Sequence, residues 1–586
     1  MKSFIKLFFA SFLALVIFCL IVFFIGIWFM GSALRADKPD LGSKGVLLLD
    51  LSTTYNEQGK DNPLASLTGN TDAGAPGLYD MVRMLHYAKT DTAIKGLYIK
   101  AGYNGNGFAT SEELRKAVVD FKESKKFVIA YGEAMDQKSY FVSTAADKVY
   151  CHPNGGIDWD GFSLTTLFMK GLLDKLGIEP QVFFAGKFKS ATETFRVTKM
   201  TDANRLQTTD LLNDLYAGFL LQTSKARNID TAALHLLAIN GSIRTAYDAE
   251  KYKLVDGLRY DDEVKAEILK KLSQKKTETI NFISFSKYAK AVDFTRNGDD
   301  KIAIIYAQGD ITGGKGSDDE IGSDNFVSII RKARLDKDVK AIVFRVNSPG
   351  GSSLASDAIW REITLAKEDK PVVVSMGDYA ASGGYYISCN ADSIFADEGT
   401  LTGSIGVFSI LPNMQPFFND KLGITFDGVK TAPYADMGST SRPLTGSEKR
   451  FLQASVDSIY FTFKTRVANG RTKDIGYIDS IAQGHVYTGL RAIPLALVDK
   501  TGTLQDAVDC AARMAKTSNY YTKEYPEKKS FFEQLAGSSP FSVSIKEDAV
   551  IKNIGAEQYS MLEQIKKIQE LMKTPQARLP FSMDIR

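Results

Sequence analysis

The order of apolar and polar positions predicts the same series of elements twice along the chain. In the first half, Lys44–Leu51, Ile94–Lys100 and Lys126–Tyr131 are short apolar runs of the kind expected for buried parallel strands. A segment with helical spacing, Ser111–Lys122, separates the second run from the third. Strand, crossover helix and strand in series predict βαβ units and hence a parallel sheet.

The second half repeats this series. Its apolar runs are Lys301–Ala307, Val339–Arg345 and Pro371–Met376, and its helical segment is Leu354–Ala366. We therefore predict an α/β protein with two homologous domains of repeated βαβ units in tandem.

The first residues differ from everything that follows them. Leu7 to Met30 carries no charged residue, and Lys2 and Lys6 precede it. As a helix this stretch would measure about 36 Å, enough to cross a hydrocarbon core of roughly 30 Å. The alternative is a cleaved signal peptide, but its small-x-small site would rest on Ser32 and Ala33, a poor version of that motif. We favour a retained transmembrane anchor.

These patterns give the predicted boundaries. They are an anchor at 1–30, a linker at 31–44, a first domain at 45–275, a linker at 276–298, a second domain at 299–520 and a charged tail at 521–586. The tail is partly helical in pattern, because Glu557 to Lys573 has apolar residues at helical spacing. It could pack on the body or at a subunit contact, or form an ordinary surface helix.

The composition excludes several classes of protein. A length of 586 residues is too great for a single core, and a net charge of +3 gives no electrostatic case for nucleic acid. The 4 cysteines lie far apart, without the spacing of a metal site or of a disulfide framework. There is no phosphate-binding loop. We expect no metal, no cofactor and no nucleic-acid partner.

Comparison of the two halves shows that each lacks a different reactive residue. The aligned segments are Met376–Ser388 with Tyr131–Ser143, and Asp420–Ile424 with Asp174–Ile178. In this register Ser382 stands opposite Gln137, and continuing without gaps places Lys189 opposite Ala435. A serine nucleophile in one copy and a lysine base in the other predict a single Ser/Lys hydrolase site where the copies meet.

A lysine can act as a base only while its amine is neutral. Its ordinary pKa is about 10.4, and burial away from water lowers that pKa. Lys189 follows the apolar run Gln181–Gly186, a context that could bury its amine, although an ordinary surface lysine at a strand end has the same context. The 4 histidines occur in no recognisable catalytic motif. Ser382 also lacks the Gly-x-Ser-x-Gly surroundings of an α/β-hydrolase.

The segment Asn347–Ser352 has the composition of a turn at a strand end whose backbone N–H groups face outward. From it and from the residue after the serine we predict an oxyanion hole made by Gly350 and Gly383. The matching turn of the first half, Gly102–Gly107, lacks the Pro-Gly-Gly sequence. The alternative is that Ser382 simply caps a tight helix start.

Four motifs occur in order along the chain: Gly186–Ala191, Asn-Ser-Pro-Gly-Gly at 347–351, Ala-Ser-Gly-Gly-Tyr-Tyr-Ile-Ser at 381–388, and Thr400–Gly406. Together they resemble the signal peptide peptidase A (protease IV) family in its long, tandem-domain, membrane-anchored form. The resemblance implies a ClpP/crotonase-like fold in both halves and a catalytic dyad of Ser382 and Lys189. It further implies that Ser404 matches a hydroxyl that orients the lysine.

The resemblance also implies where the protein works and on what. It implies a homotetramer with a single-pass anchor in the bacterial inner membrane and the catalytic body on the periplasmic side. The implied partners are the lipid bilayer, signal peptides already cut from preproteins and other apolar peptides.

Competing assignments remain open on the residues alone. Lys430 lies near the position at which single-domain relatives carry their base, but the ungapped register places it opposite Phe184. Lys187 would share a strand face with Lys189. A crotonase-type acyl-CoA enzyme and a non-catalytic membrane scaffold are the alternative functions.

Overall fold

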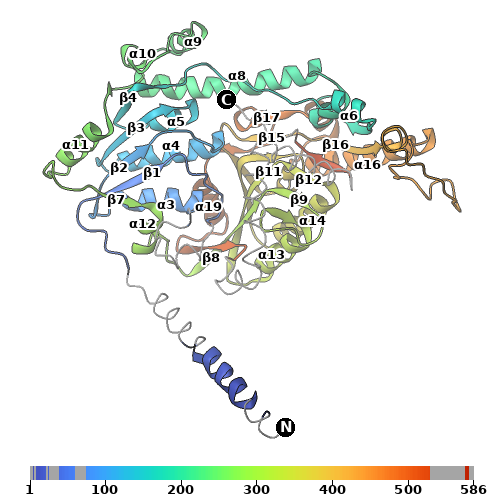
Figure 1. Cartoon of the computed structure of the whole chain (residues 1–586), viewed down its shortest axis with the longest axis horizontal. Helices are drawn as coiled ribbons and strands as arrows, with labels where there is room; N and C mark the ends of the chain where they lie inside the picture. The colour runs from blue at the N-terminus through green and yellow to red at the C-terminus, as the bar shows by residue number, and fades with distance from the viewer. Residues whose placement is uncertain are drawn as a thin grey trace.

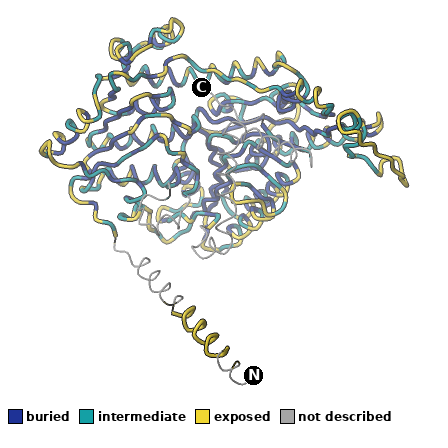
Figure 2. The backbone as a smooth tube through the Cα atoms, viewed as in Figure 1, coloured by how far each residue is buried: buried dark blue, intermediate teal, exposed yellow. Residues whose placement is uncertain are grey.

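Two α/β halves lie side by side in the computed structural model, and the N-terminal helix projects away from them (Figure 1). The structure describes residues 4, 8–21, 24, 38–59, 74, 76–527 and 575–579. Buried backbone runs through the centre of both halves, whereas residues 8–21 are exposed (Figure 2).

The first half is built on one parallel sheet with the strand order β6-β4-β3-β2-β1-β7. Its strands are β1 (Gly45–Asp50), β2 (Ile94–Lys100), β3 (Phe127–Met135), β4 (Lys148–Ile157), β6 (Gly257–Leu258) and β7 (Asn281–Ser284). Helices α3 (Leu78–Ala88), α4 (Phe108–Lys122) and α5 (Gln137–Ser143) pack on one face, and α11 (Asp261–Lys271) packs on the other.

The second half is built on an eight-stranded sheet, in which the path β18-β14-β13-β11-β8-β19 has the same order as the sheet of the first half. The strands of this path are β8 (Asp300–Gln308), β11 (Val339–Ser348), β13 (Val372–Ala381), β14 (Ser393–Ala396), β18 (Lys500–Thr501) and β19 (Tyr520–Tyr525). Two further strands, β15 (Leu401–Gly403) and β17 (Val486–Thr488), continue the sheet from the carboxyl end of β13. Helices α13 (Ser323–Leu335), α14 (Ser353–Asp369) and α16 (Gly446–Gly470) cover one face, and α19 (Leu504–Met514) covers the other. The strand-by-strand correspondence confirms the predicted pair of α/β domains.

Strands also occur near the expected domain limits. β7 and α12 (Phe285–Ala291) lie within the stretch 276–298, and β19 begins at residue 520. Both strands extend their sheets by pairing in parallel with the first strand of their own half, β7 with β1 and β19 with β8.

A third, mixed sheet joins the two halves, with the order β10-β9-β12-β20-β16-β5. Its strands are β5 (Glu179–Ala185), β9 (Asp310–Thr312), β10 (Glu320–Gly322), β12 (Gly350–Ser352), β16 (Val407–Asn413) and β20 (Gln576–Arg578). β5 comes from the first half and pairs antiparallel with β16 of the second half along its whole length. This pairing carries the residues after β5 into the second half.

Helix α8 (Asp202–Arg227) runs over the top of both halves (Figure 1). Gln207 near its start accepts a hydrogen bond from the backbone N–H of Val486, and Asp214 accepts two from Arg491. The first half is therefore bound to the second through a helix as well as through a sheet.

A buried ion cluster also joins the halves. Arg345 of β11 is fully buried and donates to Glu57 at 2.7 Å and to Glu113 of α4 at 2.6 Å. Its remaining hydrogen bonds go to the Ser375 hydroxyl and the Met376 carbonyl oxygen. Both carboxylates belong to the first half, so one guanidinium neutralises charge across the boundary.

We expect Arg345→Met to lower the free energy of unfolding by about 3–5 kcal/mol, because it leaves two buried carboxylates without their cation. Urea unfolding followed by tryptophan fluorescence measures this. Arg331→Met is the matched control, because Arg331 pairs with Glu362 from a side chain that is 54% exposed and should cost less than about 1 kcal/mol. A loss in Arg345→Met no larger than that in Arg331→Met would show that the buried cluster contributes no more stability than a surface ion pair.

The predicted anchor is described only in part. Residues 8–21 are helical, and the ends of the stretch Leu7–Met30 lie outside the described residues. Of the helices in the described part of the chain, none is long and apolar enough to cross a membrane. The predicted helical stretch Glu557–Lys573 also lies outside the described residues.

Candidate active site

The side chains of Lys189 and Ser382 meet where the two halves join. Lys189 Nζ lies 2.8 Å from Ser382 Oγ, within hydrogen-bond distance, although 193 positions separate the two residues. Lys189 is 2% exposed and Ser382 is fully buried. The structure thus brings together the serine of one copy and the lysine of the other that the comparison of the two halves singled out.

Ser382 lies in a sharp turn between β13 and α15 (Gly383–Ser388). Its φ is +54°, in the left-handed region that a non-glycine residue seldom adopts. The turn is held on both sides, because the Ser382 N–H donates to the Gly403 carbonyl and the Ser382 carbonyl accepts from the Tyr386 N–H. Strain that neighbouring structure maintains is a frequent property of functional residues.

Lys189 is positioned by the β5–β16 pairing and by two glycines. After β5 the chain turns at Gly186, and the Phe188 N–H donates to the Gln483 carbonyl. A Cβ atom on Gly484 would lie 2.8 Å from Lys189 Cβ, and one on Gly406 would lie 3.1 Å from Lys189 Cδ. The lysine side chain therefore occupies a channel that larger residues at these positions would close.

Burial sets the protonation of this lysine. Because desolvation penalises the ammonium form, the pKa of Lys189 is held well below its ordinary value. Besides Ser382, its amine donates to the Ser404 hydroxyl at 3.1 Å and to the Ser404 carbonyl at 3.3 Å. No carboxylate of the described residues pairs with it. An amine in these surroundings can accept the proton of the serine.

The predicted oxyanion residues lie next to each other. A Cβ atom on Gly350 would lie 2.7 Å from the Gly383 nitrogen, so the two strand-end turns touch. The Gly350 N–H donates to the Ser348 hydroxyl at 3.2 Å, inside its own turn. Gly351 is one residue further, in β12, where it stands opposite Ala577.

The competing lysines have other surroundings. Lys430 is exposed and bonds to Asp436 at 2.9 Å on a projecting segment of the second half. Lys187 is exposed, and its amine lies over the ring of Phe188. In the first half, Gln137 occupies the position equivalent to the serine and donates to the Gly161 carbonyl at 2.8 Å. The structure places only Lys189 of these three lysines at Ser382.

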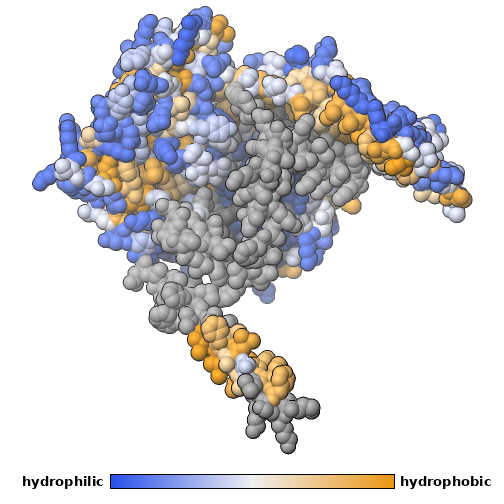
Figure 3. Space-filling model, in the orientation of Figure 1, coloured by the Kyte–Doolittle hydropathy of each residue, from blue (hydrophilic) through white to orange (hydrophobic). Residues whose placement is uncertain are grey.

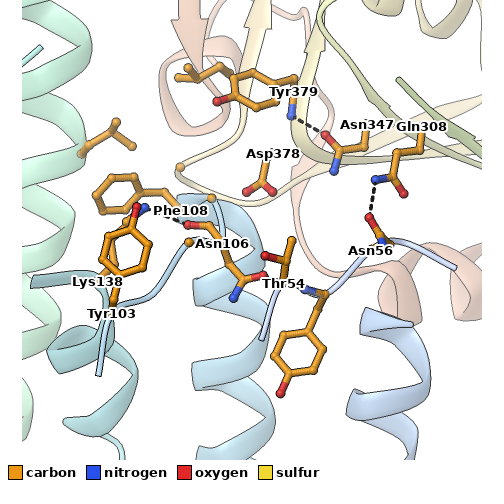
Figure 4. Close-up of a pocket in the computed structure, with 16 residues that line it drawn as sticks. Thr54, Asn56, Tyr103, Asn106, Phe108, Lys138, Gln308, Asn347, Asp378 and Tyr379 are labelled. Atoms are coloured by element: carbon orange, nitrogen blue, oxygen red, sulfur yellow. Dashed lines mark hydrogen bonds between the residues drawn. The ribbon is translucent and has the colours of Figure 1, made fainter. Parts of the chain in front are cut away.

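A cavity of about 340 Å³ lies nearby between the halves, and neither Lys189 nor Ser382 lines it. Figure 4 shows Asp378 and Tyr379 of the second half facing Phe108 and Lys138 of the first. Asp378 accepts two hydrogen bonds from Thr110, so its carboxylate also ties the halves together. Within the described ranges, no group of histidine, cysteine, aspartate and glutamate residues could hold a metal ion.

Several residues of the site did not emerge from the sequence. Gly406 and Gly484 pack against the lysine, Gln207 bonds to the Phe188 carbonyl at 3.1 Å, and the strand 576–578 lies beside Gly351. Gly406 ends the Thr400–Gly406 motif and could have been singled out from it. The other three carry no local signal.

Sequence comparison decides the family. Residues 120–276 and 364–518 match peptidase family S49, once in each half. The chain belongs to peptidase family S49. It is 35% identical over 536 residues to Protease 4 of Salmonella typhi, covering 89% of this chain and 86% of that protein. It is 33% identical to the chloroplastic serine protease SPPA of Arabidopsis thaliana, covering 73% and 64% of the two chains.

This S49 protease is also similar to a shorter relative and to a solved structure. A putative signal peptide peptidase SppA of Enterococcus faecium is 36% identical over 210 residues, 36% of this chain and 61% of that protein. Among solved structures, a ClpP1 mutant from Listeria monocytogenes is 12% identical with a TM-score of 0.24, covering 35% of this chain and 94% of that one. The predicted family, the long form of signal peptide peptidase A, is confirmed, and the protein is a serine protease.

Proposed function

We propose that this S49 protease is a membrane-anchored endopeptidase in which Ser382 and Lys189 form a catalytic dyad that degrades cleaved signal peptides. The observation that carries the proposal is the buried 2.8 Å contact between a lysine with a lowered pKa and a serine in a strained turn. At this distance a neutral amine can take the proton of the serine hydroxyl and so activate it as a nucleophile.

Acylation follows from this geometry. Neutral Lys189 accepts the proton of Ser382 as Oγ attacks the scissile carbonyl carbon, and the negative oxygen is held by N–H groups of the Gly350–Gly351 turn and of Gly383. The tetrahedral intermediate then collapses. The peptide C–N bond breaks, the lysine ammonium gives its proton to the leaving amine, and an ester joins the new carboxyl end to Ser382.

Deacylation uses the same groups in reverse. Lys189, neutral again, accepts a proton from a water molecule whose oxygen attacks the ester, and returns that proton to Ser382 Oγ as the ester bond breaks. Ser404 orients the lysine through its hydroxyl and its carbonyl oxygen. The net reaction consumes one water molecule for each peptide bond.

The substrate class rests on the sequence and on the relatives. A 24-residue apolar stretch, Leu7–Met30, would place the body at a membrane surface, where cleaved signal peptides partition into lipid. The Enterococcus faecium relative bears the name signal peptide peptidase. We place the anchor in the bacterial inner membrane and the body on the periplasmic side.

We also propose that the protein assembles into a homotetramer, and the repeat suggests how neighbouring copies pair. The equivalent of β5 in the second half is residues 425–431, in which Phe426 and Val429 are exposed. These residues belong to the segment that projects from the body of the molecule (Figure 3). The equivalent of β16 in the first half is residues 161–167, irregular apart from a bridge at Leu164. We propose that 425–431 of one copy pairs with 161–167 of the next, as β5 pairs with β16 within one chain.

The proposal is tested with full-length protein in lipid vesicles. A fluorophosphonate should label Ser382, located by mass spectrometry, and a synthetic signal peptide should be cut within its apolar segment while a polar peptide of equal length stays intact. Turnover of an acyl-CoA thioester without labelling would support a crotonase-type enzyme instead. If the protein were neither labelled by the fluorophosphonate nor able to cleave the signal peptide, it would be a non-catalytic scaffold.

A further inference from the structure

The edge of the first sheet at which its strands begin is basic. Strands β1, β2 and β3 are parallel, so their first residues lie together at this edge. Helix α11 ends there too, because the Lys271 amine lies 5.8 Å from the centre of the Phe127 ring and the Lys44 amine donates to the Ser273 carbonyl at 3.3 Å. The lysines of this edge, which we call the amino-edge lysines, are Lys44, Lys95, Lys125, Lys270, Lys271, Lys275 and Lys276.

The amino-edge lysines have no ion pair with any carboxylate of the described residues. All of them are exposed except Lys44, which is half-buried. Two carboxylates lie at the same edge, but they bind neighbouring groups instead. Asp91 accepts from the Ala93 N–H at 2.9 Å, and Glu278 accepts from the Lys275 backbone N–H at 2.9 Å. The edge therefore presents a surplus of positive charge to its surroundings.

The second half provides an internal comparison, because its sheet contains the same strand order. In the register of the first two strands, Lys44 is equivalent to Asp300 of the second half. Lys95 is equivalent to Lys340 in the same register. Lys340 and Asp300 form an ion pair at 4.0 Å. The first half, which follows the predicted anchor, thus has two positive charges where the second half has a neutral pair.

The predicted anchor leads directly to this edge. An extended chain covers the steps from Met30 to Lys38 in at most about 29 Å. The residues that follow already lie on the body, because the Leu41 carbonyl accepts a hydrogen bond from the Asn281 side chain at 2.7 Å. Figure 1 shows the chain running from beside β7 toward the N-terminal helix. A bilayer that holds the anchor is therefore within reach of the amino-edge lysines.

We propose that the amino-edge lysines form a docking surface for anionic phospholipid headgroups, which holds the first half against the membrane that carries the anchor. The assignment rests on the proposed function, since it takes Leu7–Met30 as that anchor. Clusters of about four to eight basic residues beside a membrane span are typical of binding to anionic lipid. A tether alone leaves the body free to rotate, whereas a second contact fixes one edge of it at the lipid surface.

Acetylation of amines on the full-length chain in lipid vesicles, located by mass spectrometry, tests the proposal. One vesicle type contains phosphatidylcholine alone, and the other also contains anionic phosphatidylglycerol. We expect the amino-edge lysines to react about fivefold more slowly in the anionic vesicles. The reason is that a negative surface favours the ammonium form, which the reagent cannot attack. Salt at about 1 M should remove the difference, because it shortens the Debye length to about 3 Å.

A charge-reversal variant tests whether the lysines act as one surface. It combines Lys270→Glu, Lys271→Glu, Lys275→Glu and Lys276→Glu, and the protection of Lys95 and Lys125 should then disappear. The matched control reverses lysines that are also exposed and have no ion pair within the described residues, but lie elsewhere: Lys225, Lys449, Lys473 and Lys500. It should leave the protection intact. Both variants should cleave a soluble peptide with the native kcat/KM, which shows that they are folded.

Flotation of the vesicles in a density gradient distinguishes the two ways in which the proposal can fail. A chain that floats with both vesicle types but reacts equally in them has an anchor and no docking surface for anionic lipid. Protection of Lys95 that persists in the charge-reversal variant would overturn the docking surface as well. A chain that does not float with the vesicles would instead overturn the anchor, and with it the membrane-anchored part of the proposed function.

Discussion

Replacing Ser382 with alanine should reduce kcat/KM for peptide cleavage at least about a thousandfold, the scale on which removal of a nucleophile acts in serine proteases. The loss should fall on kcat, because the groove between β12 and β16 and its glycines are unaltered. Initial rates measured under substrate excess and by single turnover separate the two parameters.

Ser388→Ala is the matched control for this variant. Ser388 is also a buried serine, at the end of the same helix, but its hydroxyl donates only to the Gly384 carbonyl. Its removal should change kcat/KM less than about threefold, within the range of a local packing effect. Cleavage by Ser382→Ala at the native rate would mean that another group is the nucleophile.

The repeat was the part of the sequence that predicted the site. The ungapped register paired Ser382 with Gln137 and Lys189 with Ala435. The structure shows what surrounds Gln137 and Ala435, the residues that stand in place of the serine and the lysine. Gln137 holds the Gly161 loop through two hydrogen bonds, and Ala435 is exposed on the projecting segment. The position of the missing serine has thus acquired a structural role in the first copy, whereas the position of the missing lysine lies at the surface in the second.

The strands of the two parallel sheets were also predictable, since continuous apolar runs are typical of strands buried on both faces. The mixed sheet was not. β9, β10, β12 and β20 are each three residues long, too short to show a period. In addition, β12 and β20 are defined by pairing with segments far away in the sequence. β20 lies in a polar, charged tail whose composition gives no indication that Ala577 and Leu579 become buried.

The β5–β16 pairing explains why a lysine of one domain serves the other. β5 leaves the first half and pairs with β16 in the mixed sheet, so Lys189, four residues after the end of β5, lies against Gly484 and Gly406. Burial of the amine is therefore a consequence of domain docking. A change that separated the halves would expose Lys189, restore its ordinary protonation and remove the base as well as the geometry.

Replacing Lys189 with methionine should lower kcat at least about a thousandfold and remove the alkaline rise of the pH–rate profile. Methionine keeps the length and the apolar contacts of the side chain but cannot accept a proton. In the native chain only the neutral amine is active, so kcat/KM should rise with pH as Lys189 loses its proton. Because burial lowers the pKa of Lys189, that rise should be complete well below about pH 10, where an ordinary lysine is still largely charged.

The lowered pKa of Lys189 also affects stability. It favours catalysis, but near pH 7 it lowers the free energy of unfolding of the native chain. Between the lowered pKa of the folded state and about 10.4 in the unfolded state, the unfolded chain binds more protons, so the free energy of unfolding rises with pH. Lys189→Met removes this dependence and should be more stable than the native chain near pH 7, by a margin that shrinks as the pH approaches about 10. Lys187→Met, two residues away and exposed, should change neither profile. If Lys189→Met retained the native pH–rate profile, the base would have to be another group, and the buried lysine would be a structural residue.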